Sequence, residues 1–349
     1  MVSLKIYRDR TEQLKKILKK ENLDAILVLN LDEPFKDPNF LYFAATDPTN
    51  SVYVFDNEAK IITNSLELPK IKAESFVKKI IVPKVKFSFF LKKTTTGKKI
   101  GVTELFPALL AKKLGGKFFD ITNHLEEIRA IKSKEEIINI KKASKTAAEI
   151  TSNLKNFIKS GVTENEVKNF INIQILKYGS ETPPFAQIVN AGKNSSVPHP
   201  LNSNKKIRSG DVVLVDFLCK YKNYFTDISR VFFIGKIDKK ILTKYQLLQN
   251  VFEKICEKIE PNISGAVLDK AARKALGADA KYFTHALGHG VGLAPHEKPH
   301  ISEKSKDILK EGMVFAIEPG IYFKNFGLRI EDTFLLTKKG LQNLTKSPL

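Results

Sequence analysis

The sequence predicts two domains, an α/β domain over residues 1–127 and a larger α+β domain over residues 128–349. A length of 349 residues fits two domains of ordinary size. In the first part, helical periodicity alternates with short apolar runs, which is typical of an α/β fold. In the second part, long helices with strong start signals precede apolar runs that each end near an acidic or histidine side chain. The second part therefore carries the candidate site.

The amino-terminal domain opens with a predicted helix over residues 12–20, followed by a strand at 25–29. A further helix is expected over residues 107–114, because Pro107 suits the first turn and Gly115-Gly116 ends the periodic pattern. Two more short runs have strand character. These strands are expected at residues 51–55 and 60–63.

The connection between the domains is expected at residues 121–132. Directly after it, Ser133 stands three residues before Glu136, a spacing that predicts a capping box at the start of a long helix. Thr163 and Glu166 repeat this signature and predict the start of a second helix. The larger domain therefore begins with two helices before its first strands.

Five side chains with oxygen or nitrogen ligand atoms lie in mostly apolar stretches of the larger domain. An isolated carboxylate is costly to bury, so acids in such stretches indicate a compensating partner. Two-metal hydrolases use this combination of carboxylates and imidazole. The candidates are Asp216, Asp227, His289, Glu318 and Glu331.

The first two candidates flank the polar segment 220–223, whose composition predicts a hairpin turn. Folding about the midpoint of Tyr221 and Lys222 sets Asp216 directly opposite Asp227. Opposed residues have Cβ atoms about 4.5 to 5.5 Å apart, and two like charges there are destabilising unless a cation lies between them. The alternative is two surface aspartates on a polar hairpin, which the apolar run before Asp216 disfavours.

Both glutamates lie at or near predicted strand ends. Glu318 ends an apolar run that Pro319 and Gly320 interrupt. Glu331 shares one strand face with Arg329, because side chains alternate with a period of two. The guanidinium is then expected outside the ligand shell, where it orients the acids and offsets their charge. Taken singly, each glutamate could equally be an ordinary acid at a strand end.

Histidines are unevenly distributed. The chain has six, and four of them lie between residues 285 and 300, in a stretch where Gly288, Gly290 and Gly292 permit close backbone approach. Imidazole serves both as a metal ligand and as a proton carrier. The clustering indicates a functional role, although His300 and the isolated His124 fit ordinary core or surface residues.

Composition excludes several other classes. The net charge of +20 comes mainly from scattered lysines, with only seven arginines, whereas specific nucleic-acid readers concentrate basic residues in a patch. Cys219 and Cys256 are too few for a disulfide framework, and Cys219 fits a small buried hydrophobe rather than a nucleophile. Neither a targeting signal nor a membrane span is visible. We expect a cytoplasmic protein that binds neither membranes nor specific nucleic acids.

These motifs resemble the pita-bread metallopeptidases, the family of methionine aminopeptidase, aminopeptidase P and prolidase, most closely from residue 128 onward. The resemblance implies a creatinase-like amino-terminal domain and a pita-bread catalytic domain. It assigns the five candidates as ligands of two metal ions, with Asp227 and Glu331 bridging. It also implies that His199 and His296 contact the substrate or the tetrahedral intermediate. Leu218 and Ala294-Pro295 depart from the usual pattern beside the ligands and leave substrate preference open.

The implied chemistry is hydrolytic. Carboxylate and imidazole ligands suit Mn or Co, with Zn or Fe as alternatives. A hydroxide bridging the two ions would attack the scissile carbonyl, because metal binding lowers the pKa of water from about 15.7 toward about 7. Glu318 is the candidate for handling the proton, and His199 and His296 would donate hydrogen bonds to the intermediate.

The amino-terminal domain narrows the family resemblance. Minimal methionine aminopeptidases lack such a domain, whereas prolidases and aminopeptidases P have one, so the resemblance implies cleavage of the bond before proline. The substrate is an Xaa-Pro dipeptide or the amino end of a longer peptide, and the motifs do not separate the two. A homodimer is expected. The alternative is a non-catalytic peptide- or protein-binding module on the same fold.

Overall fold

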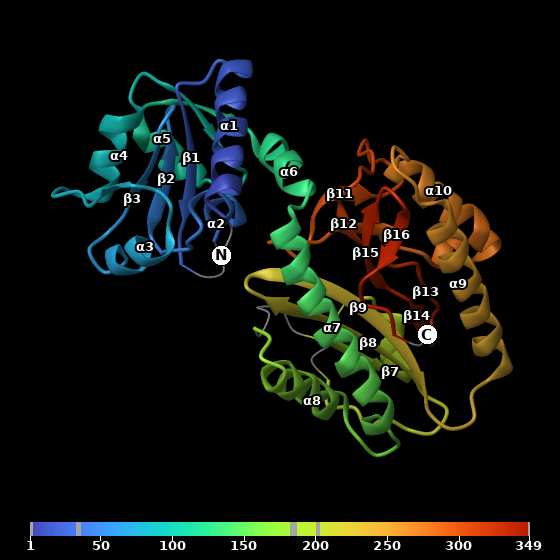
Figure 1. Cartoon of the computed structure of the whole chain (residues 1–349). Helices are drawn as coiled ribbons and strands as arrows, with labels where there is room; N and C mark the ends of the chain where they lie inside the picture. The colour runs from blue at the N-terminus through green and yellow to red at the C-terminus, as the bar shows by residue number, and fades with distance from the viewer. Residues whose placement is uncertain (1–2, 33–35, 182–186, 200–202, 348–349) are drawn as a thin grey trace. The chain divides into compact units, whose positions relative to one another are not determined.

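The computed structural model describes residues 3–32, 36–181, 187–199 and 203–347. The chain forms two compact units, Met1–Arg129 and Ala130–Leu349, each with its own sheets and its own buried residues (Figure 1). Along the chain, the division between the units falls after Arg129, two residues beyond the boundary that the sequence predicts.

The first unit is an α/β domain built on one six-stranded mixed sheet, in the order β4-β3-β2-β1-β5-β6. The central strand β1 is buried at every residue, pairs antiparallel with β2 and pairs parallel with β5. Its strands are β1 (Ala25–Asn30), β2 (Ser51–Phe55), β3 (Ala59–Ile62), β4 (Lys79–Ile81), β5 (Lys99–Val102) and β6 (Lys117–Asp120). Its helices are α1 (Leu4–Lys20), α2 (Pro38–Ala44), α3 (Leu68–Glu74), α4 (Phe87–Thr95), α5 (Ala108–Leu114) and α6 (Thr122–Ala130).

Local signals account for several of these boundaries. Helix α1 begins eight residues earlier than predicted, at Leu4, because the Ser3 side chain caps it by accepting from the backbone N–H of Ile6. Helix α5 matches its prediction closely. Pro107 is its N-cap, and Gly115 ends it in the left-handed conformation, with φ of 70°.

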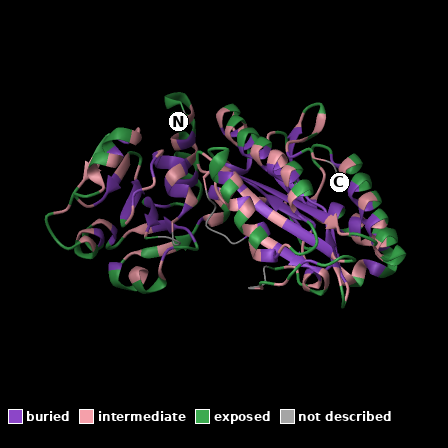
Figure 2. Ribbon diagram, turned by 90° about the horizontal axis from the view of Figure 1, so that it is seen from below, coloured by how far each residue is buried: buried purple, intermediate pink, exposed green. Residues whose placement is uncertain are grey.

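The second unit consists of two sheet layers with helices on their outer faces. The three-stranded sheet β7-β8-β9 packs against α7, which packs in turn on α8, and the five-stranded sheet β11-β10-β12-β15-β16 has α9 and α10 on its other side (Figure 1). An isolated bridge between Ser229 and Glu331 joins the two sheets. The strands lie buried between helices whose outer faces are exposed (Figure 2).

The helices of this unit are α7 (Lys134–Phe157), α8 (Glu164–Lys177), α9 (Lys239–Lys258) and α10 (Gly265–Leu276), with 3-10 turns η1 (Gly192–Ser196) and η2 (Gly277–Tyr282). The strands are β7 (Ile188–Ala191), β8 (Val212–Tyr221), β9 (Tyr224–Phe233), β10 (Gly288–Gly290), β11 (Glu297–Ile301), β12 (Val314–Ile317), β13 (Gly320–Tyr322), β14 (Gly327–Arg329), β15 (Asp332–Thr337) and β16 (Gly340–Asn343).

Both predicted capping boxes are confirmed. The Ser133 side chain accepts from the backbone N–H of Glu136, and the Glu136 carboxylate accepts from the backbone N–H of Ser133. Thr163 and Glu166 make the same reciprocal pair at the start of α8. Among the described helices, none combines the length and the apolar character that crossing a membrane requires.

Candidate active site

A cavity of about 540 Å³ opens in the second unit. Part of its wall is acidic, and another part is lined by the apolar residues Ile188, Phe217, Leu218 and Pro295. All eight site residues predicted from the sequence line this cavity. They are His199, Asp216, Asp227, His289, His296, Glu318, Arg329 and Glu331.

The β8–β9 hairpin supplies the two aspartates, but the predicted register is wrong by two residues. Tyr221 pairs with Tyr224, and Asp216 consequently lies opposite Ser229 rather than opposite Asp227. A shift of two residues leaves every side chain on its original face of the sheet. Asp216 and Asp227 therefore remain on one face as diagonal neighbours, still within reach of a shared ligand.

The turn of this hairpin explains the register. Lys222 and Asn223 form a two-residue connection, with φ of 47° and 69°. Two-residue turns of this kind need positive φ at both central positions, and asparagine tolerates that conformation better than most residues. Asn223 was the residue in the sequence that could have indicated the turn. The turn is centred between Lys222 and Asn223, one residue later than the predicted midpoint between Tyr221 and Lys222.

Glu331 and Asp227 are fixed by neighbouring hydroxyl groups. The Ser229 hydroxyl donates to Glu331 Oε2 at 2.7 Å. The Thr333 hydroxyl accepts from the backbone N–H of Asp227 at 3.0 Å and donates to its carbonyl at 2.8 Å. Glu331 has only 1% of its surface exposed. The Glu331 carboxylate and the Asp227 backbone are thus held at the junction of the two sheets.

His289 lies at the centre of the acidic part of the cavity. Its Nδ1 is 3.1 Å from the carbonyl of Gly290, so Nδ1 carries the proton and the lone pair of Nε2 faces the acids. Nε2 lies 4.0 Å from Asp227 Oδ2, 3.6 Å from Glu318 Oε1 and 4.0 Å from Glu331 Oε1. These separations leave room for a cation between the imidazole and the carboxylates.

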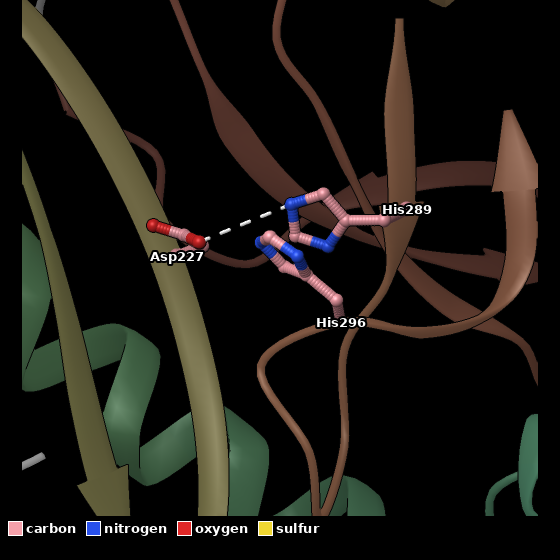
Figure 3. Close-up of side chains that lie close together, drawn as sticks. All are labelled: Asp227, His289 and His296. Carbon is pink, nitrogen blue, oxygen red and sulfur yellow. Dashed lines mark ion pairs between the residues drawn. The ribbon is translucent and has the colours of Figure 1, made fainter. Parts of the chain in front are cut away.

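Three overlapping groups of side chains could hold metal ions, because in each group one ligand atom from every residue lies within 4.8 Å of the others. Two groups contain only predicted ligands. The third includes His296, whose ring centroid is 4.0 Å from that of His289 (Figure 3). The groups are Asp216, Asp227 and Glu331; His289, Glu318 and Glu331; and Asp227, His289 and His296.

The electrostatics of the site favour bound cations. Among the described residues lining the cavity, Arg329 is the only permanent positive charge facing four carboxylates. Burial, and then the negative charge of neighbouring Asp227, raises the pKa of Glu331 well above its usual value, and burial raises the pKa of Glu318 to about 8. Burial lowers the pKa of His289 to about 3, which keeps its imidazole neutral and able to bind a metal.

Arg329 bonds to the acids and to two hydroxyl groups. Its Nη2 donates to Asp216 Oδ2, and its Nε donates to the Ser229 hydroxyl at 3.0 Å. Its Nη1 donates to the Tyr322 hydroxyl at 2.7 Å. The guanidinium therefore orients Asp216 directly and Glu331 through Ser229.

Two residues near the acids were not predicted as site residues. The hydroxyl of Tyr322 lies 2.9 Å from Nε2 of His285, which lines the cavity. Burial, followed by the charge of Arg329, lowers the pKa of His285 to about 3. The clustering of histidines could have identified His285, whereas Tyr322 has no local sequence signal because only the tertiary fold brings it to Arg329.

His199 and His296 lie at the exposed part of the cavity wall. The His199 carbonyl accepts from the Asn190 side chain at 3.0 Å, which fixes the backbone of the segment after η1. His296 follows the loop from β10 and stands beside His289. Both imidazoles are accessible to a bound molecule.

Residues 138–338 match the family model described as Metallopeptidase family M24. This match spans more than half of the chain. The chain belongs to metallopeptidase family M24. Residues 10–131 match a second model, the Creatinase/Prolidase N-terminal domain. The predicted fold class, an α/β amino-terminal domain followed by a pita-bread catalytic domain, is confirmed.

Relatives of known name are similar over nearly the whole chain. The Xaa-Pro dipeptidase of Pyrococcus furiosus is 33% identical, over 97% of this chain and 98% of the relative. The crystal structure of the prolidase from Pyrococcus horikoshii OT3 matches with a TM-score of 0.91 and 32% identity, over 97% of this chain and 99% of that one. The crystal structure of the X-Pro aminopeptidase from Thermotoga maritima matches with a TM-score of 0.86 and 30% identity, over 97% of this chain and 98% of that one. The predicted enzyme class, a metallopeptidase, is confirmed.

Proposed function

We propose that this M24 enzyme hydrolyses the peptide bond preceding proline, with two divalent metal ions in the cavity of the second unit. The observation that carries this proposal is the convergence of three carboxylates within 4.0 Å of the free nitrogen of His289. The names of relatives that are similar over almost their full length support the choice of substrate.

The residues present fit a pair of metal ions. Buried carboxylates whose pKa values are raised by their mutual repulsion gain stability from cations, which replace the missing positive charge. Mn or Co are the expected metals, with Zn or Fe as alternatives. Two such ions would lower the pKa of water to produce a nucleophile and polarise the scissile carbonyl. The residues that would hold the ions are Asp216, Asp227, His289, Glu318 and Glu331, of which Asp227 and Glu331 would serve both ions.

The remaining groups of the cavity position the substrate. Glu318 follows β12 at the cavity wall and keeps 16% of its side chain exposed, so it can exchange a proton with a bound molecule. His199 and His296 are placed to donate hydrogen bonds to the carbonyl oxygen as it gains charge. Arg329 orients Asp216 and offsets part of the negative charge.

The apolar part of the cavity suits a proline ring. Leu218 lies on the same face of β8 as Asp216, Ile188 on β7 pairs with Asp216, and Pro295 completes this part of the wall. Burial of a pyrrolidine ring there would place the preceding carbonyl toward the acids. The substrate is an Xaa-Pro dipeptide or the amino end of a longer peptide. The expected homodimer and the cytoplasmic location remain predictions, and sedimentation of the purified protein checks the first.

The decisive experiment compares two substrates side by side. The purified chain loaded with Mn or Co should hydrolyse an Xaa-Pro dipeptide or an Xaa-Pro tripeptide, and the preferred length distinguishes a dipeptidase from an aminopeptidase. Glu318→Gln should abolish turnover, whereas the matched control Glu303→Gln, on an exposed loop, should not. Turnover that survives exhaustive chelation would rule out the metal mechanism. No turnover of any amino-terminal peptide would favour the binding module.

A further inference from the structure

A buried ion pair lies beneath one wall of the cavity. Lys132, between α6 and α7, has its Nζ 2.8 Å from Oε1 of Glu297, the first residue of β11. Their side chains are 1% and 2% exposed. Removing one partner of a buried pair leaves the other charge uncompensated, so each charge fixes where the other lies.

The Glu297 carboxylate supports the loop of residues 291–296, which joins β10 to β11. Its Oε2 accepts from the backbone N–H of Ala294 at 3.3 Å. Gly292 packs directly on the same carboxylate, since a Cβ at this position would lie 2.2 Å from Glu297 Oε1. The Gly292 N–H donates to the Ala294 carbonyl at 3.1 Å, which closes the loop tightly. The conformation of the loop thus depends on where the Glu297 carboxylate is held.

This loop ends in His296, the residue immediately before Glu297. His296 lines the cavity, and its ring lies tilted beside that of His289 at 4.0 Å between ring centroids (Figure 3). Successive side chains of an extended chain point in opposite directions. His296, however, is a bend residue outside β11, so alternation alone does not orient it. Because His296 is bonded directly to Glu297, the point at which the Glu297 carboxylate is anchored also sets the position of the His296 backbone.

We propose that Lys132, acting through Glu297, is a positioning residue that holds the 291–296 loop and presents His296 to the substrate. Lys132 Nζ also donates to the carbonyl of Ala130 at 3.2 Å, so the ammonium is itself fixed at two points. The metal ligands lie on other strands or on β10 before the loop. This inference rests on the proposed function only in assigning His296 a contact with substrate.

The test replaces Lys132 by methionine, which keeps much of the side-chain volume and removes the charge. In the Mn-loaded enzyme, Lys132→Met should lower kcat for Xaa-Pro hydrolysis by about 10- to 100-fold, because small misplacements of a catalytic group have effects of that size. KM and the affinity for Mn should change by less than about threefold. Lys298→Met is the matched control, since it removes a lysine ion pair with Asp307 from the same strand and should leave kcat unchanged.

A double-mutant cycle tests whether Lys132 acts on kcat through His296 or through the stability of the whole site. In a His296→Ala background, Lys132→Met should have almost no further effect on kcat, because the group that it positions is already absent. An equal loss of kcat in both backgrounds would overturn the proposal. A parallel loss of Mn affinity would overturn it too, since the pair would then support the metal site.

Amide hydrogen exchange of the 291–296 loop provides a readout that needs no activity. Lys132→Met should accelerate exchange in this loop and leave exchange in β7 and β8 unchanged. If this variant does not fold, Lys132→Met combined with Glu297→Gln removes both charges and allows the same measurement. Unchanged exchange in the folded variant would refute the positioning role. A wild type that shows no Xaa-Pro turnover would refute the proposed function and leave the exchange test to decide on the loop.

Discussion

Glu331 and Asp332 are adjacent acids with opposite surroundings. Both are buried, with 1% and 2% of their surface exposed. Asp332 does not line the cavity, and both of its carboxylate oxygens accept hydrogen bonds. Oδ1 lies 2.8 Å from Arg230 Nη2 and accepts from the Thr345 hydroxyl, while Oδ2 accepts from the Asn343 side chain. Glu331 points into the cavity and faces other carboxylates.

The two acids differ in the charges that surround them. Burial raises the pKa of both groups, but the next contribution differs in sign. The guanidinium of Arg230 lowers the pKa of Asp332, whereas the carboxylate of Asp227 raises the pKa of Glu331 further. The protein supplies its own cation to Asp332. Glu331 instead faces carboxylates, which is the environment that we expect for the metal ligand proposed above.

The largest expected effect follows from removing the charge of Glu331. Glu331→Gln should abolish detectable turnover and lower metal affinity by more than the ~10- to 100-fold typical of residues outside the ligand shell. Unfolding in the absence of metal should require at least as much free energy as in the wild type, because a buried like charge is gone. Isothermal titration with Mn and chemical denaturation measure the two quantities. A variant that retains metal affinity would exclude Glu331 as a ligand.

The corresponding change at the neighbouring residue should act on stability instead. Asp332→Asn leaves Arg230 buried without its carboxylate and should lower the free energy of unfolding by about 3–5 kcal/mol. Metal affinity of the folded protein should change little, since Asp332 does not line the cavity. Urea denaturation monitored by circular dichroism gives the first quantity. Equal destabilisation by Glu331→Gln would remove the distinction between the two acids.

Metal should stabilise the wild type selectively. Free Mn at 100 times its dissociation constant should add about 2.7 kcal/mol to the free energy of unfolding. The same concentration should add much less to Glu331→Gln, whereas Asp332→Asn should respond as fully as the wild type. Thermal unfolding with and without chelator checks this. A wild type whose Tm is unaffected by metal would contradict the interpretation of the acidic cluster.

The sequence predicted the contents of the site better than its geometry. All eight predicted residues line one cavity. Carboxylates that end apolar strand runs need compensating partners, and a common cavity can supply those partners to all of them. The hairpin register was wrong, since the choice of turn depends on two left-handed residues, Lys222 and Asn223, that a polar segment does not pinpoint.

Other features required the tertiary fold. Tyr322 meets Arg329 and His285 only through the packing of separate strands, and neither its neighbours nor its spacing marks it. Lys132 and Glu297 are 165 residues apart in sequence, and nothing local predicts that they pair. Long-range polar contacts of this kind depend on how strands and helices are brought together, which periodicity does not encode.

The smallest effects are expected when the hydroxyl groups that donate hydrogen bonds to Glu331 and Asp332 are removed. Ser229→Ala removes the donor to Glu331 Oε2 and the acceptor for Arg329 Nε, so metal affinity should fall by about 10- to 100-fold with the ligands intact. Thr345→Ala is the matched change beside Asp332. It also removes the acceptor for the buried Thr333 N–H, so it should cost about 1–3 kcal/mol of stability, without an effect on metal. Calorimetric titration and urea denaturation of both variants provide the comparison. If Ser229→Ala altered stability alone, the hydroxyl would support the sheet junction rather than the orientation of Glu331.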